Sequence, residues 1–103
     1  MIKIRFCPPF TLEVSGHAGY AKKGEDIVCA SVSALYWALV KSLEEEQKNG
    51  RGMMTVEGRK VSFNPRTEDD WAVITTIYVT VFRGLSLIAE RYSEYAEVDD
   101  GHL

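Results

Sequence analysis

The chain has 103 residues, 46% of them apolar, and carries a formal net charge of −3. These values predict one domain over residues 1–103 and argue against the basic surface through which nucleic-acid-binding proteins contact phosphates. Two cysteines are too few for a secreted disulfide framework, and we expect neither a signal peptide nor a membrane span, hence a soluble cytoplasmic protein.

The first half of the chain predicts two strands followed by a long helix. Apolar and polar residues alternate over 2–6 and again over 10–15, which is the period of a half-buried strand. After a glycine-bearing loop, Asp26 suits the N-cap of a helix that runs to about Asn49. Because this helix is apolar almost all round over 27–40, we expect it to be buried against the sheet and also against a second helix or subunit.

The second half of the chain predicts a hairpin and a second helix. Apolar residues flank Gly58-Arg59 as they do in a hairpin, and Pro65 ends its second strand. The segment 71–92 is rich in β-branched residues, yet its apolar positions recur every three or four residues over a length too great for a strand. We therefore predict a helix that begins with the acidic residues 68–70. The fold class that follows is α+β, an antiparallel sheet with two main helices on one face, in the order ββαββα.

His17 and Cys29 are the pair of residues that points to chemistry. Cys29 is expected at about the third position of the long helix, where the dipole and the free N–H groups favour the nucleophilic thiolate. A nearby histidine can accept the thiol proton and later protonate a leaving amine, and the helix-start N–H groups could receive the oxyanion of acyl transfer. The structural alternative is that Cys29 is a small core residue and His17 a surface or capping group.

Two segments of the chain resemble the signature of the ribosomal-processing cysteine proteases of bacteria, the Prp family. They are Gly16-His17-Ala18 and, after a glycine-bearing loop, Gly24-Glu25-Asp26-Ile27-Val28-Cys29-Ala30-Ser31-Val32-Ser33-Ala34-Leu35. Residues 84–92 are also similar to the family's last helix. The resemblance implies a cysteine endopeptidase without a cofactor, in which Cys29 is the nucleophile and His17 the base. The sequence departs from many relatives at Ser31, where they carry glycine.

The resemblance also implies a substrate, an assembly and supporting residues. In the family, the substrate is the short N-terminal extension of large-subunit ribosomal protein number twenty-seven, cut beside an aromatic pair and before an alanine, and members are homodimers. Asp26 and Ser33 match family positions implicated in supporting the site, and Gly16 and Gly19 would let the backbone bend and approach the substrate. The structural alternatives are a helix cap for Asp26 and, for Ser33, a hydroxyl that bonds back to a helix carbonyl.

Two other classes of function compete with the peptidase. The first is a non-catalytic module that binds a ribosomal protein or an assembly factor, which an apolar first helix would fit equally well. The second is a metal site formed by Cys7, His17, Cys29 and His102, but their spacing matches no zinc motif, and we expect no metal. We expect His102 to lie in a disordered tail, and neither nucleic acid nor a membrane to be a partner.

Overall fold

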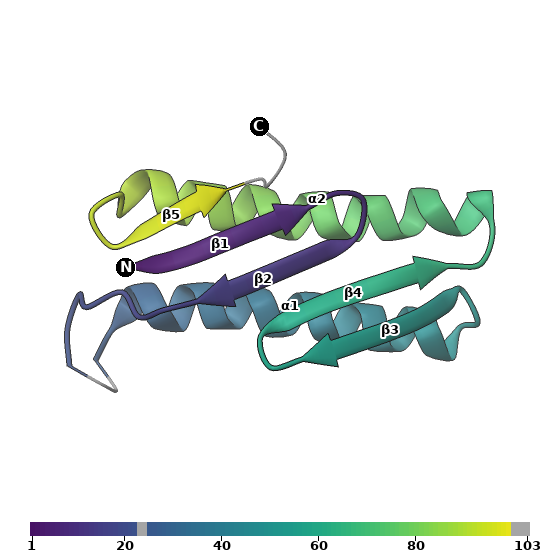
Figure 1. Ribbon diagram of the computed structural model, residues 1–103, viewed down its shortest axis with the longest axis horizontal. Helices are drawn as coiled ribbons and strands as arrows, with labels where there is room; N and C mark the ends of the chain where they lie inside the picture. The colour runs from purple at the N-terminus through teal and green to yellow at the C-terminus, as the bar shows by residue number, and fades with distance from the viewer. Residues whose placement is uncertain (23–24, 100–103) are drawn as a thin grey trace.

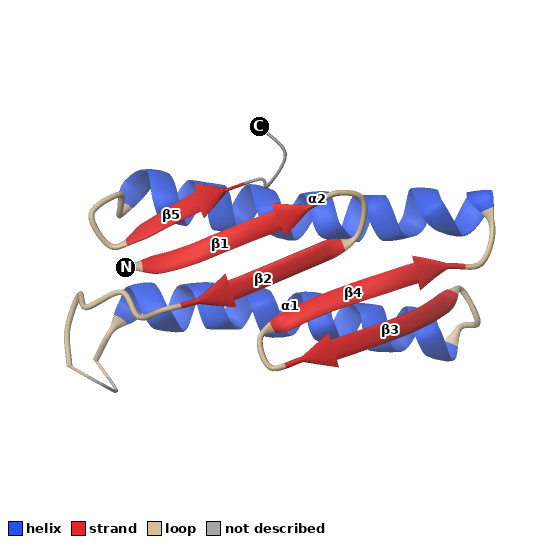
Figure 2. Cartoon of the chain, viewed as in Figure 1, coloured by secondary structure: helices blue, strands red, loops and turns tan. Residues whose placement is uncertain are grey.

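The computed structural model describes residues 1–22 and 25–99 and has two layers, a five-stranded sheet and two helices that cover one of its faces (Figures 1 and 2). In chain order, the elements are β1 (Ile2–Cys7), β2 (Thr11–Ser15), α1 (Ile27–Lys48), β3 (Gly52–Glu57), β4 (Lys60–Pro65), α2 (Glu68–Arg91) and β5 (Ala96–Asp99). The α+β class with both helices on one face is therefore confirmed.

The order of strands in the sheet is β3-β4-β2-β1-β5, and the first four strands of the chain pair antiparallel, as predicted. Alternation fixes which residues face the helices, because successive side chains of a strand point to opposite faces. Ile4 and Leu12 are fully buried, whereas their neighbours Arg5 and Glu13 face the open side and pair directly across β1 and β2. The predicted turn at Gly58-Arg59 is present, since Glu57 pairs with Lys60.

The fifth strand is the element that the sequence did not predict. β5 pairs parallel to β1, with Ile4 opposite Val98, so the sheet is mixed rather than purely antiparallel. It has only four residues, two of them acidic, and so carries too little periodic signal to be recognised by pattern. Its position is set by contacts that are distant in sequence, such as the Ile2 N–H that donates to the Tyr95 carbonyl at 2.8 Å.

Both helices begin and end close to where the sequence predicts. Asp26 caps α1, and Asn49 is its C-cap residue, followed by Gly50 at a φ of 79°. α2 has Thr67 as its N-cap, in a capping box with Asp70 that the sequence analysis missed. The two helices run side by side beneath the sheet (Figure 1).

The core lies between the sheet and the two helices. Its largest fully buried side chains come from both layers and are Tyr36, Tyr78, Ile4, Leu12, Leu39, Leu43, Ile74, Leu85, Val28, Val32 and Val61. Val14, near the end of β2, and Val28, near the start of α1, both belong to this core; β2 leads into the segment that carries His17, and α1 carries Cys29.

The helices are also apolar on part of their outer surface. Trp37 on α1 is 52% exposed and Leu87 on α2 is 50% exposed. By length and composition alone, both helices would pass as membrane spans, which the sequence analysis did not anticipate. This is weak evidence for a membrane, because core helices of soluble proteins have the same character. α1 packs against α2, which is the second helix that the sequence analysis expected to cover it, and Trp37 lies outside that buried surface.

Candidate active site

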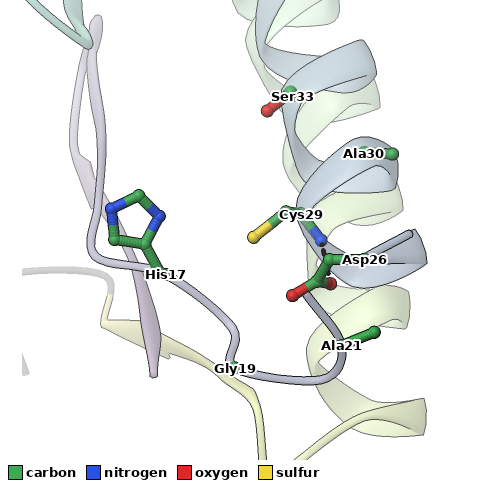
Figure 3. Close-up of a pocket in the computed structure, with 7 residues that line it drawn as sticks. All are labelled: His17, Gly19, Ala21, Asp26, Cys29, Ala30 and Ser33. Carbon is green, nitrogen blue, oxygen red and sulfur yellow. Dashed lines mark hydrogen bonds between the residues drawn. The ribbon is translucent and has the colours of Figure 1, made fainter. Parts of the chain in front are cut away.

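A pocket of about 550 Å³ lies where the segment after β2 meets the start of α1. Its lining comes from these two parts of the chain and comprises His17, Gly19, Ala21, Asp26, Cys29, Ala30 and Ser33 (Figure 3). Five of the six residues that the sequence analysis selected thus line one cavity, and the sixth, Gly16, does not.

Cys29 occupies the third residue of α1, as predicted. The helix starts here because the Asp26 side chain accepts hydrogen bonds from the N–H groups of Val28 and Cys29, at 3.0 and 2.9 Å. Asp26 is therefore an N-cap, and the capping alternative for this residue is correct. It also follows that these two N–H groups are not free to bind an oxyanion, so the expectation that the helix start would supply those donors is wrong for Val28 and Cys29.

Asp26 has a second role beyond the cap, because it also ties the loop to the helix. The N–H of Tyr20 donates to the other carboxylate oxygen at 3.2 Å. The hydrogen bond from the Cys29 backbone, followed by that from Tyr20, holds the pKa of Asp26 below its ordinary value against the opposing effect of desolvation. The carboxylate is therefore ionised at neutral pH and joins the two sides of the pocket.

The thiol of Cys29 receives a hydrogen bond that no sequence pattern predicts. The backbone N–H of Ala18 donates to Cys29 Sγ at 3.4 Å, and the Ala18 side chain is buried. The hydrogen-bond donor at the sulfur thus comes from the loop and not from the helix terminus.

His17 faces Cys29 across the pocket. Figure 3 shows the two side chains on opposite sides, with the sulfur pointing toward the imidazole ring. His17 is exposed, and within residues 1–22 and 25–99 no hydrogen bond orients its ring. In substrate-free active sites, catalytic hydrogen bonds are often long or poorly aligned, so two side chains that face each other without a hydrogen bond are a common arrangement there.

Gly16 shapes the turn that carries His17. Its φ is +81°, and a Cβ at this position would lie 2.3 Å from the carbonyl oxygen of Met1. The main chain of His17 is held at the same point, because its carbonyl accepts a hydrogen bond from the Met1 amino group. Gly16 therefore permits a close approach of two backbone segments, whereas Gly19, at a φ of +70°, lines the pocket itself.

Ser33 lies one turn after Cys29 and its hydroxyl points to the same side of α1 as the sulfur (Figure 3). Its oxygen lies 3.5 Å from Nη2 of Arg59, which is in the β3–β4 turn. In the part of the chain that the structure describes, no bond returns from this hydroxyl to the carbonyl four residues earlier, in contrast to Ser31, which donates to Ile27 at 2.6 Å. The back-bonding alternative for Ser33 is therefore not what the structure shows.

The described residues contain no cluster of metal-ligating side chains. Among the described residues, no group of three or more His, Cys, Asp or Glu side chains converges as metal ligands do. Cys7 and Cys29 are both free thiols, and His102, the remaining member of the considered set, lies outside the described residues.

The site consists of a half-buried thiol at a helix start that faces an imidazole across a pocket. This arrangement makes it a candidate cysteine hydrolase site. The sequence profile of the family described as cysteine protease Prp matches residues 1–97. A relative from Mycoplasma pneumoniae, named ribosomal processing cysteine protease Prp, is 30% identical over 89 residues, which cover 86% of this chain and 85% of the relative. The chain therefore belongs to the cysteine protease Prp family.

Solved structures share the fold. The ribosomal processing protease Prp from S. aureus, in complex with a covalently linked product peptide, matches with a TM-score of 0.66 and 22% identity over 96% of each chain. The same protease in complex with a substrate peptide matches with a TM-score of 0.61 and 19% identity, again over 96% of each chain. At these identities, the likeness supports the fold described above.

Proposed function

We propose that the chain is a cysteine endopeptidase in which Cys29 is the nucleophile and His17 the general base. The observation that carries the proposal is the pocket that both side chains face, where the Ala18 N–H already donates to the sulfur. Membership of a cysteine protease family adds the reaction class. Asp26, Gly16 and Ser33 are proposed as supporting residues, Asp26 because it ties the loop to the helix.

The first half of the reaction forms an acyl-enzyme. His17 takes the proton from the Cys29 thiol, and the thiolate sulfur attacks the carbonyl carbon of the scissile peptide bond. When the tetrahedral intermediate collapses, the C–N bond breaks and the imidazolium of His17 gives its proton to the departing amine. The N-terminal part of the substrate is left as a thioester on Cys29.

The second half restores the enzyme with water. His17 takes a proton from a water molecule, whose oxygen attacks the thioester carbonyl carbon. The C–S bond then breaks, the proton returns to the sulfur, and the cleaved segment leaves with a new carboxyl group. No cofactor or metal is required in either half.

The proposed substrate is the N-terminal extension of large-subunit ribosomal protein number twenty-seven, in the cytoplasm. The M. pneumoniae relative is named as a ribosomal processing protease, and the S. aureus structures hold a product peptide and a substrate peptide. The pocket agrees with a peptide, because it is open on one side and lined by small residues such as Gly19, Ala21 and Ala30. These leave room for a backbone beside the sulfur.

The proposed assembly is a homodimer that covers the apolar outer face of the helices. Trp37 on α1 and Leu87 on α2 are each about half exposed, so a partner subunit could bury apolar surface on both helices. Replacing Trp37 by Glu should shift the chain to monomers in analytical ultracentrifugation, with Lys41→Glu as a polar control on the same helix. A monomeric wild-type chain at micromolar concentration would contradict this part of the proposal.

The experiment that tests the function is cleavage of the full-length ribosomal protein, with product masses read by mass spectrometry. Wild-type protein should release one N-terminal fragment, whereas Cys29→Ala and His17→Ala should release none while keeping the wild-type circular dichroism spectrum. Cys7→Ser should cleave normally, since Cys7 is not part of the pocket. If Cys29→Ala binds the substrate but wild type never cleaves it, the chain is a binding module and the proposed activity is wrong.

A further inference from the structure

The β3–β4 turn brings a cation to the hydroxyl of a pocket residue, Ser33, from a part of the chain that carries no other site residue. Arg59 is the second residue of this two-residue turn, and its Nη2 lies 3.5 Å from the Ser33 hydroxyl oxygen. Ser33 in turn lines the pocket one helical turn beyond Cys29. The guanidinium has donors only, so in this contact the Ser33 oxygen accepts.

The position of the turn is fixed by main-chain contacts. The carbonyl of Arg59 accepts a hydrogen bond from the N–H of Val14 at 2.9 Å, at the end of β2. β2 leads directly through Gly16 to His17. The segment that carries the base and the turn that carries the cation are therefore held in register by the sheet.

The guanidinium also lies over the same face of α1. Burial raises the pKa of the Tyr36 phenol, and the nearby positive charge of Arg59 opposes that rise. Tyr36 follows Ser33 by three residues, so both lie on one side of the helix. Arg59 does not line the pocket itself but contacts it through Ser33, which lies farther along the helix from Asp26 than Cys29 does (Figure 3).

The contact has a chemical consequence for the Ser33 hydroxyl. Helix hydroxyls commonly donate to the carbonyl four residues earlier, and Ser31, Thr76 and Thr80 do so here. Ser33 shows no such bond among the described residues, while its oxygen accepts from a charged donor. Its proton is then available on the pocket side, and a hydroxyl polarised by a cation is a stronger donor.

We propose that Arg59 is a positioning residue of this peptidase, which acts through Ser33 by turning the serine proton toward a carbonyl oxygen of the bound peptide. The inference rests on the proposed function. Arg59 itself contacts Ser33 rather than the reacting atoms, so its effect should depend entirely on the presence of the serine hydroxyl.

A double-mutant cycle on peptide cleavage tests whether the effect of Arg59 depends on the Ser33 hydroxyl. Arg59→Gln should lower kcat roughly three- to tenfold with little change in KM, which is the value of one hydrogen bond that tightens in the transition state. Arg59→Lys should recover part of the loss, because an ammonium also donates. In the Ser33→Ala background, Arg59→Gln should have no further effect. Lys60→Gln, which removes the same charge from the neighbouring residue, should cleave like wild type.

Two outcomes overturn the inference while the proposed function stands. One is an Arg59→Gln variant that cleaves like wild type. The other is an Arg59→Gln effect of equal size with and without the Ser33 hydroxyl, because Arg59 would then act by its charge alone. A chain that cleaves no ribosomal substrate in its wild-type form is a different result, which refutes the peptidase itself and the inference with it.

Discussion

Replacing Gly16 by alanine should damage the fold and the site together. Gly16 has a φ of +81°, and a non-glycine residue in this left-handed region costs roughly 1–2 kcal/mol. The new Cβ would also lie 2.3 Å from the Met1 carbonyl oxygen. That oxygen belongs to backbone, and the next residue, Ile2, is fixed by its hydrogen bond to Tyr95, so little can move to relieve the contact.

Gly19 provides the matched control. Its φ of +70° imposes the same conformational cost, but nothing lies within 4 Å of the position where its Cβ would be. Gly19→Ala should therefore lower the free energy of unfolding by only about 1–2 kcal/mol, whereas Gly16→Ala should exceed this by at least about 1 kcal/mol. For a domain of this size, each kcal/mol corresponds to a Tm shift of roughly 4–8 °C.

Urea denaturation followed by circular dichroism measures the difference between the two variants. The cleavage assay should show a larger loss for Gly16→Ala, measured at a temperature where both variants are folded, since the displaced turn carries His17. Equal unfolding free energies for the two variants would mean that the Met1 contact relaxes without cost, and the steric reasoning would be refuted.

Three further predictions concern the caps and the buried phenols. Asp26→Ala and Thr67→Ala each remove an N-cap and should lower Tm by several degrees. Of these two variants, only Asp26→Ala should also reduce cleavage. Asp26→Asn should keep most of the stability, because asparagine is also a good N-cap. The hydrogen bond from the Thr67 hydroxyl holds the pKa of Asp70 below its ordinary value. The ionised carboxylate should therefore contribute its full stability above the ordinary pKa, and this contribution should be lost as the pH falls through the lowered pKa. In thermal melts below about pH 4, Tm should fall more steeply with pH for wild type than for Asp70→Asn. Tyr36→Phe should leave the free energy of unfolding unchanged or higher, because its buried hydroxyl has no partner in the described structure, whereas Tyr78→Phe should lose about 1 kcal/mol with the hydrogen bond to the Val61 carbonyl.

The elements with a long periodic signal could be predicted from the sequence, and those set by distant contacts could not. The helix α2 was predicted against its β-branched composition because its apolar spacing persists for more than five turns. β5 was missed because four residues give no usable period and its strand pairing depends on β1, more than ninety residues away in the chain.

In the site, too, some residues could be predicted from the sequence and others could not. Cys29 and His17 could be selected because thiol and imidazole chemistry is visible in residue types, and the cap at Asp26 places the thiol in the first helical turn. The Ala18 N–H could not be selected, since a backbone donor has no signature in the sequence. Arg59 was visible only as part of a turn, and its contact with Ser33 requires the register of three strands.

The position of the loop, more than that of the helix, governs the chemistry of Cys29. A helix start normally stabilises a thiolate through free N–H groups, but here Asp26 accepts two of them and brings its own negative charge. The sulfur instead accepts a hydrogen bond from the other side of the pocket, from the Ala18 N–H, and the His17 ring faces it from the same side. Both belong to the segment after β2, which Asp26 holds in place through Tyr20. The carboxylate thus weakens the helix as an anion site and at the same time fixes the segment that donates to the sulfur, so the proposed role of Cys29 as a nucleophile requires that this segment stay bound to α1.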